Sequence, residues 1–150
     1  MPDYPPLSTQ VIGQAESALG ALLDPLLAGT RITFRQWLVL TVTAGRGDGT
    51  GRDQLAARIA DARKTSQAEI EAAIAELAAA GLVTADGPVV LTDTGQAAYQ
   101  RIRGRLDEIT TRLFDFPAED LATAGRVLGI VTARANAVLS GQASPRLALG

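Results

Sequence analysis

Two helix patterns joined by a short turn, and followed at once by a hairpin pattern, most restrict what this chain can fold into. The second helix begins with a capping box, in which the Ser66 hydroxyl accepts from the Glu69 amide and the Glu69 carboxylate reaches back. Its apolar residues keep helical spacing up to Gly81, and residues 82–92 then read as two strands around an Asp-Gly-Pro turn. The pattern predicts a helix-turn-helix with a wing, because a hairpin directly after the helices makes a plain helical hairpin the weaker interpretation.

Two helices and a connection precede this unit, whose first helix is expected over 53–61. Residues 7–28 repeat apolar positions every three or four residues and predict a long amphipathic helix. Thr33 is a plausible N-cap for a nearly all-apolar helix that ends near Ala44, which we expect at the centre of the fold. The glycine-rich residues 45–51 are expected to form a flexible connection, followed by a short helix over 53–61.

Two long helices are expected to follow the hairpin. Thr92 or Thr94 begins the first, and Pro117 is suited to the first turn of the second. Both repeat apolar residues with the 3.5-residue period of a coiled-coil-like seam. In the last helix this seam consists of Leu121, Ala124, Leu128, Val131, Ala135 and Val138. We expect the seam to pair with a second copy rather than to pack on the first helix of the same chain. Residues 141–150 are expected to be a disordered tail.

The composition excludes several kinds of chemistry. The 150 residues include no Cys and no His, which excludes thiol redox chemistry, the usual zinc sites and a Ser-His-Asp triad. The glycine-rich segment follows a helix and lacks Gly-Lys-Ser/Thr, so it is not a phosphate-binding loop. We therefore expect no enzyme, no metal and no cofactor. There is no apolar run long enough to cross a membrane and no secretory signal, so a cytoplasmic protein is expected.

In the order and spacing of its motifs, the chain resembles the multiple-antibiotic-resistance regulator (MarR) family over residues 7–140. The residues that carry the resemblance are Phe34-Arg35-Gln36-Trp37, Leu55-Ala56, Leu77, Gly81-Leu82-Val83, Leu91-Thr92-Asp93-Thr94-Gly95 and Pro117-Ala118-Glu119-Asp120. The resemblance implies a mainly α fold with a small β-hairpin wing, in a homodimer that binds an operator with two half-sites. It implies a DNA-binding lobe over 33–92 and dimer helices over 7–28 and 93–140. It does not distinguish a repressor from an activator.

Candidate DNA-contacting residues lie on the third helix and at the start of the fourth. The candidate phosphate contacts are Arg52, Arg58, Arg63 and Lys64, and the candidate base contacts are Ser66, Gln67, Ala68 and Glu71. For Arg58, Arg63 and Lys64 the alternative is a solvated charge that balances Asp61 or Glu69.

The chain departs from the family pattern in its charge. The fourth helix carries Glu69, Glu71 and Glu76 but no Arg or Lys, the wing carries no Arg, and the net charge is −2. The turn around residues 60–65 is also longer than the family pattern. These departures favour an alternative, a winged-helix protein with weak or lost DNA binding that acts through ligand or protein contacts.

The resemblance also implies a pocket for a small apolar or aromatic ligand between the dimer helices and the winged lobe. Its candidate residues are Leu19, Leu23, Phe34, Trp37 and Tyr99, for which ordinary core packing is the alternative. A basic stretch on the fifth helix is interpreted as surface ion pairs, with Arg103 four residues before Asp107 and Glu108 four before Arg112.

Overall fold

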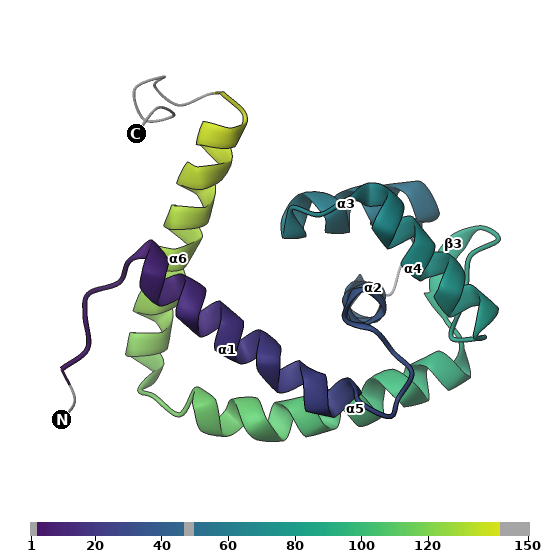
Figure 1. Ribbon diagram of the computed structural model, residues 1–150, viewed down its shortest axis with the longest axis horizontal. Helices are drawn as coiled ribbons and strands as arrows, with labels where there is room; N and C mark the ends of the chain where they lie inside the picture. The colour runs from purple at the N-terminus through teal and green to yellow at the C-terminus, as the bar shows by residue number, and fades with distance from the viewer. Residues whose placement is uncertain (1–2, 47–49, 142–150) are drawn as a thin grey trace. The chain divides into compact units, whose positions relative to one another are not determined.

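The computed structural model describes residues 3–46 and 50–141, which form six helices and three short strands (Figure 1). The elements are α1 (Thr9–Leu27), α2 (Phe34–Arg46), β1 (Thr50–Gly51), α3 (Arg52–Arg63), α4 (Gln67–Ala79), β2 (Val83–Thr84), β3 (Pro88–Leu91), α5 (Asp93–Leu113) and α6 (Ala118–Leu139). The fold is therefore mainly α with a small antiparallel sheet, as predicted. The chain divides into two compact units, Met1–Glu108 and Ile109–Gly150.

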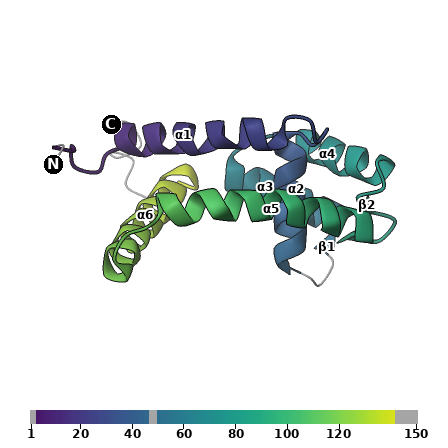
Figure 2. The ribbon, with the colours of Figure 1, turned by 90° about the horizontal axis from the view of Figure 1, so that it is seen from below.

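The core of the first unit lies around α2, which is packed against α3, α4 and β3. Val39 and Leu40 of α2 are completely buried, as expected for a helix with apolar residues on nearly every side. Figure 2 shows α2 lengthwise, with α3 and α4 beside it. The predicted inward faces of the two neighbouring helices are confirmed as buried: Leu55, Ala56 and Ile59 on α3, and Ile70, Ala73, Ile74 and Leu77 on α4.

The wing is a three-stranded sheet in the order β1-β3-β2, with both pairings antiparallel. Val83 pairs with Leu91 in the predicted hairpin. The flexible connection predicted over 45–51 is wrong at both ends, because Gly45 and Arg46 belong to α2, and Thr50 pairs with Val89 and extends the sheet. Residues 47–49 lie outside the described residues. The glycine-rich sequence carries no β signal, and the pairing exists because β3 has an open edge beside the start of α3.

The connection from the wing to α5 explains the Leu-Thr-x-x-Gly pattern. The Thr92 hydroxyl donates to the Gly81 carbonyl at 2.7 Å and accepts from the Gly95 amide at 3.0 Å, so Thr92 is the N-cap. A Cβ at Gly95 would overlap the Leu82 carbonyl. The helix start and the strand backbone are therefore in direct contact, which only glycine permits.

The remaining helix ends follow their local sequence. Gly29 and Gly81 have φ of +82° and +78°, and each follows a helix that ends just before it. Pro117 is the residue that immediately precedes α6, one position earlier than predicted. Among the residues that the structure describes, no helix is both long and apolar enough to span a membrane.

The second unit contains the end of α5 and all of α6. No residue of α6 is buried. Leu121, Leu128 and Val131 of the predicted seam are each about 40% exposed, at 38%, 39% and 40%. The predicted tail begins at Gly141, and from residue 142 onward it lies outside the described residues.

Candidate nucleic-acid interface

The turn between α3 and α4 is built around a left-handed residue. Lys64 has φ of 53° and ψ of 47°, a conformation that costs a residue with a Cβ about 1 kcal/mol. The Thr65 amide donates to the Ala60 carbonyl at 3.0 Å, which ends α3. The long turn predicted over 60–65 is wrong: residues 60–63 are helical, so the extra residues lengthen α3, and the chain reverses over residues 64–66 before α4 begins at Gln67. This short reversal makes α3 and α4 a helix-turn-helix pair.

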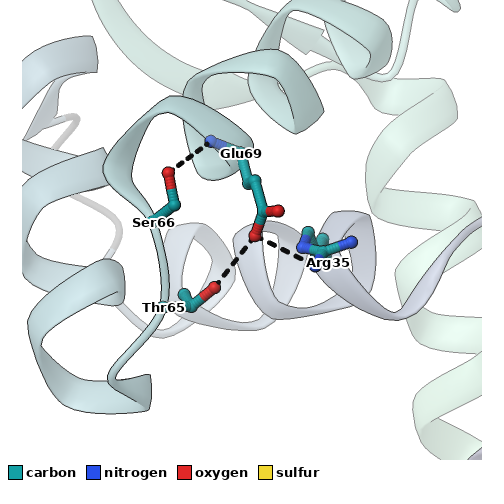
Figure 3. Close-up of polar contacts among 4 residues, drawn as sticks. All are labelled: Arg35, Thr65, Ser66 and Glu69. Atoms are coloured by element: carbon teal, nitrogen blue, oxygen red, sulfur yellow. Dashed lines mark hydrogen bonds and ion pairs between the residues drawn. The ribbon is translucent and has the colours of Figure 1, made fainter.

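The capping box at the start of α4 forms only in part. The Ser66 hydroxyl accepts from the Glu69 amide at 3.4 Å, as predicted. The Glu69 carboxylate does not behave as predicted: its Oε2 accepts from the Thr65 hydroxyl at 3.2 Å and pairs with Arg35 at 3.0 Å (Figure 3). A guanidinium from α2 is a stronger partner for a carboxylate than a backbone amide, because both groups are charged.

A second glutamate of α4 also turns toward α2. The Glu76 carboxylate accepts from the buried Gln36 amide group at 2.8 Å. The other end of Gln36 accepts from the Thr33 amide at 3.1 Å, and the Thr33 hydroxyl accepts from the Gln36 amide at 3.2 Å. Thr33 and Gln36 thus form a complete capping box at the start of α2. Its Thr-x-x-Gln pattern was the sequence signal that could have identified Gln36.

Because Glu69 and Glu76 turn toward α2, the outer face of α4 is largely apolar. Ala68, Ala72, Ala75 and Ala79 are spaced four, three and four residues apart, and all are exposed. Among the predicted base contacts, only Ser66 and Gln67 offer side-chain hydrogen-bonding groups beside this face, because Glu71 is partly buried. Alanine methyl groups can contact the methyl group of thymine but cannot read a hydrogen-bonding edge.

The predicted phosphate-contacting cations lie on α3 and its turn, each with a different environment. Arg63 is 4.0 Å from Glu16 and lies over the Phe34 ring, with its Cζ 5.6 Å from the ring centroid. Lys64 is 3.7 Å from Asp61. The two cations are about half-exposed and their acidic partners are more exposed still, so these ion pairs hold the cations weakly.

The two other cations lie further along α3. Arg52 donates to the Glu71 carbonyl at 3.2 Å and so ties the start of α3 to α4. Arg58 is exposed on the outer side of α3. The wing turn adds no cation, since its exposed charged residue is Asp86. The basic side chains near the start of α4 therefore come from α3 and the turn after it, together with Arg35 of α2, which was not among the predicted contacts.

The predicted ligand residues lie in different environments. Trp37, 4% exposed, stacks on Tyr99 with ring centroids 5.4 Å apart. Leu23 packs against the same core, whereas Leu19 is exposed.

Phe34 lines a small cavity of about 290 Å³ next to the α3–α4 turn. Leu38, Arg35 and Arg63 also line this cavity. The structure thus brings Trp37 and Tyr99 together, and places Phe34 beside the two arginines that contact glutamates.

This arrangement of helices and strands also occurs in known proteins. A helix-turn-helix family model matches residues 26–145. No curated protein matches the sequence. Ligand-free NadR is 23% identical with a TM-score of 0.71, over 87% of this chain and 99% of its own, and NadR has also been solved in complex with 4-hydroxyphenylacetate.

Two further structures have the same fold. CouR from Rhodococcus jostii, bound to p-coumaroyl-CoA, is 16% identical with a TM-score of 0.68, over 81% of this chain and 88% of its own. The MarR family protein Rv2887 of Mycobacterium tuberculosis, in complex with DNA, is 21% identical with a TM-score of 0.58, over 86% of this chain and 98% of its own. The chain therefore belongs to a helix-turn-helix family and has the winged-helix fold of the MarR-type proteins.

Proposed function

We propose that this protein is a homodimeric winged-helix transcription regulator, without enzymatic activity, that binds operator DNA and is released by a small ligand. The observation that carries the proposal is the helix-turn-helix pair, in which the exposed start of α4 stands directly after the cationic turn at Arg63 and Lys64. The N-terminus of a helix attracts phosphate, and adjacent cations add to this attraction. In a helix-turn-helix the N-terminal part of the second helix contacts the bases.

The proposed contacts divide into two kinds. Arg52, Arg58, Arg63 and Lys64 contact phosphates. Ser66, Gln67 and Ala68 face the bases, with the partly buried Glu71 beside them. The alanine face of α4 favours A·T-rich sites, because it suits thymine methyl groups. Affinity then depends chiefly on phosphate contacts and falls steeply with salt.

A charge-matched pair of variants tests the DNA surface. Lys64→Asn removes one cation but keeps the turn, because Asn tolerates the left-handed conformation. Arg126→Gln removes one cation from α6 and is the control. Fluorescence anisotropy with DNA from the protein's own promoter region, at several salt concentrations, should show that Lys64→Asn weakens binding and lowers the salt slope by about one per lost contact. Equal binding of promoter and scrambled DNA by the unmodified protein at every salt concentration contradicts specific operator binding.

The acidic α4 supports a second candidate function. A winged-helix protein that has lost operator binding would act through a ligand or another protein instead. Glu69, Glu71 and Glu76 repel phosphates, and no Arg or Lys on α4 compensates for them. This candidate predicts that Lys64→Asn leaves cellular activity unchanged.

The last part of the proposal is that a small ligand releases the protein from DNA. The complexes of NadR with 4-hydroxyphenylacetate and of CouR with p-coumaroyl-CoA support a ligand with an aromatic group. The proposed site for it consists of Leu19, Leu23, Phe34, Trp37 and Tyr99. Trp37 is the only tryptophan, so its fluorescence reports on this region. Titration with 4-hydroxyphenylacetate should change that fluorescence and release bound promoter DNA over the same concentration range. A fluorescence change without DNA release contradicts the coupling, because release requires different affinities in the two states.

A further inference from the structure

Two consecutive residues at the start of α2 hold two glutamates of α4. Arg35 pairs with Glu69 at 3.0 Å (Figure 3), and the side-chain nitrogen of Gln36 donates to the Glu76 carboxylate at 2.8 Å. The two glutamates are seven residues apart, so they lie on one side of α4, two turns and about 10 Å apart along its axis. Contacts at two separated points fix the tilt of a helix as well as its distance. The first turn of α2 therefore sets the tilt of α4.

Of these two contacts, the one at Gln36 is the more restrictive. Gln36 is only 8% exposed, so its amide group has little access to water, and loss of its partner would leave a buried donor unsatisfied. The acceptor is a carboxylate, which strengthens the hydrogen bond. The Arg35–Glu69 pair is about half-exposed, so water can replace either partner at little cost. The position of α4 therefore depends mainly on the contact between Gln36 and Glu76.

The side chain of Gln36 is itself held in one orientation. Its Oε1 accepts from the Thr33 amide at 3.1 Å, which leaves the nitrogen end for α4. If the amide group were turned over, two donors would face each other at Thr33. The next residue, Trp37, stacks on Tyr99 and ties the same turn of α2 to α5. The donor that Glu76 contacts is therefore held at a fixed place.

The tilt of α4 matters because its outer face has few hydrogen-bonding groups. Contacts made by the exposed alanine methyl groups of this face weaken steeply with distance, so a small change of tilt would lose them. Arginine and lysine side chains on α3 and the turn are long and flexible, so phosphate contacts tolerate the same displacement. Phosphate contacts carry no sequence information, whereas base contacts do. A tilted α4 would therefore discriminate less between DNA sequences and still bind DNA.

We propose that Gln36 is a positioning residue for sequence recognition, which fixes the tilt of α4 through its hydrogen bond to Glu76. The inference rests on the proposed function, because it requires that the outer face of α4 contacts bases. It goes further in assigning specificity to a buried residue of α2 that is not a proposed DNA contact.

A charge-matched pair of variants at an exposed position tests the proposal. Glu76→Ala and Glu76→Gln remove the same charge, but only glutamine keeps an acceptor for Gln36. Fluorescence anisotropy gives the ratio of affinities for DNA from the protein's own promoter region and for scrambled DNA. We expect Glu76→Ala to lower this ratio at least about fivefold, the effect of one mismatched base pair, and Glu76→Gln to keep it. Equal ratios in the two variants overturn the proposal.

An exchange of the two side chains tests the contact from the side of α2. Gln36→Glu alone sets two carboxylates against each other and should lower the ratio. The double variant Gln36→Glu/Glu76→Gln has the net charge of the unmodified protein and forms the hydrogen bond with donor and acceptor exchanged, while the new carboxylate can still accept from the Thr33 amide. It should recover the ratio, and failure to recover it in a folded double variant contradicts the proposal. Urea unfolding verifies that each variant is folded, and the Glu76 pair decides the question if Gln36→Glu is not.

The same titrations separate this inference from the proposed function. Equal affinity of the unmodified protein for promoter and scrambled DNA contradicts operator binding, and the role of Gln36 with it. A preference for promoter DNA that is the same in the unmodified protein and in every variant contradicts the role of Gln36 alone.

Discussion

Glu69 shows how one side chain can set the charge of a surface. In the sequence it is the last residue of a capping box, and on that basis it would only stabilise a helix end. In the structure it instead pairs with Arg35 and so neutralises a cation beside the start of α4. The pair is about half-exposed, at 52% and 49% of the two side chains, so it contributes little to stability but affects the local charge.

Replacement of Glu69 by Gln should therefore strengthen DNA binding. The change removes a carboxylate near the phosphates and releases Arg35, which can add about one phosphate contact and steepen the salt dependence by about 0.9 in log–log slope. Stability should change by less than about 1 kcal/mol. Anisotropy titrations at several salt concentrations measure the slope.

Glu76→Gln is the matched control for this experiment. It removes the same charge from the same helix, but its partner is Gln36, so no cation is released. If both variants change the slope equally, the effect is one of net charge, and the specific role of Arg35 is wrong.

At the scale of elements, the junction between the wing and α5 depends on contact between two backbones. Thr92 connects the end of α4 to the start of α5, and Gly95 lies against the Leu82 carbonyl. The sequence pattern correctly located this helix start through the threonine. The reason for the glycine could not be read from the pattern, because it depends on how closely the strand approaches the helix.

Gly95→Ala should destabilise the protein by about 1–3 kcal/mol, because the added methyl group cannot fit without displacing backbone. Gly104→Ala, on the same helix, is the control: a Cβ there meets nothing within 4 Å, so this variant should gain up to about 1 kcal/mol from helix propensity. Urea unfolding followed by circular dichroism gives both values. A neutral or stabilising effect of Gly95→Ala would disprove the close contact.

At the scale of the whole molecule, α6 is a long helix without a buried residue. Its seam of Leu121, Leu128 and Val131 has the spacing of a paired helix and stays about 40% exposed, at 38–40%. Apolar surface of this regularity is typical of a subunit interface. Homodimerisation through this seam is part of the proposed function, and two-fold pairing would match an operator with two half-sites.

Leu128→Glu should break the dimer, because the interface would bury two uncompensated charges. We expect the dimer dissociation constant to rise at least about a hundredfold, which corresponds to about 2.7 kcal/mol. Ala133→Glu adds the same charge on the opposite side of α6 and should leave the association unchanged. Sedimentation velocity over a range of concentrations measures both. Equal sedimentation of the two variants and the unmodified chain excludes the seam as the interface.

The sequence by itself determined the order of the helices, the hairpin of the wing and most of the helix caps. Those features depend on residues within a few positions of one another, such as Ser66 with the Glu69 amide and Thr92 with Gly95, and short-range periodicity and hydrogen bonding encode them. Only the tertiary structure decided that Thr50 joins the sheet, that Glu69 pairs with Arg35, and that Gln36 donates to Glu76. These contacts join residues far apart in the chain, and packing of the core around α2 brings them within reach.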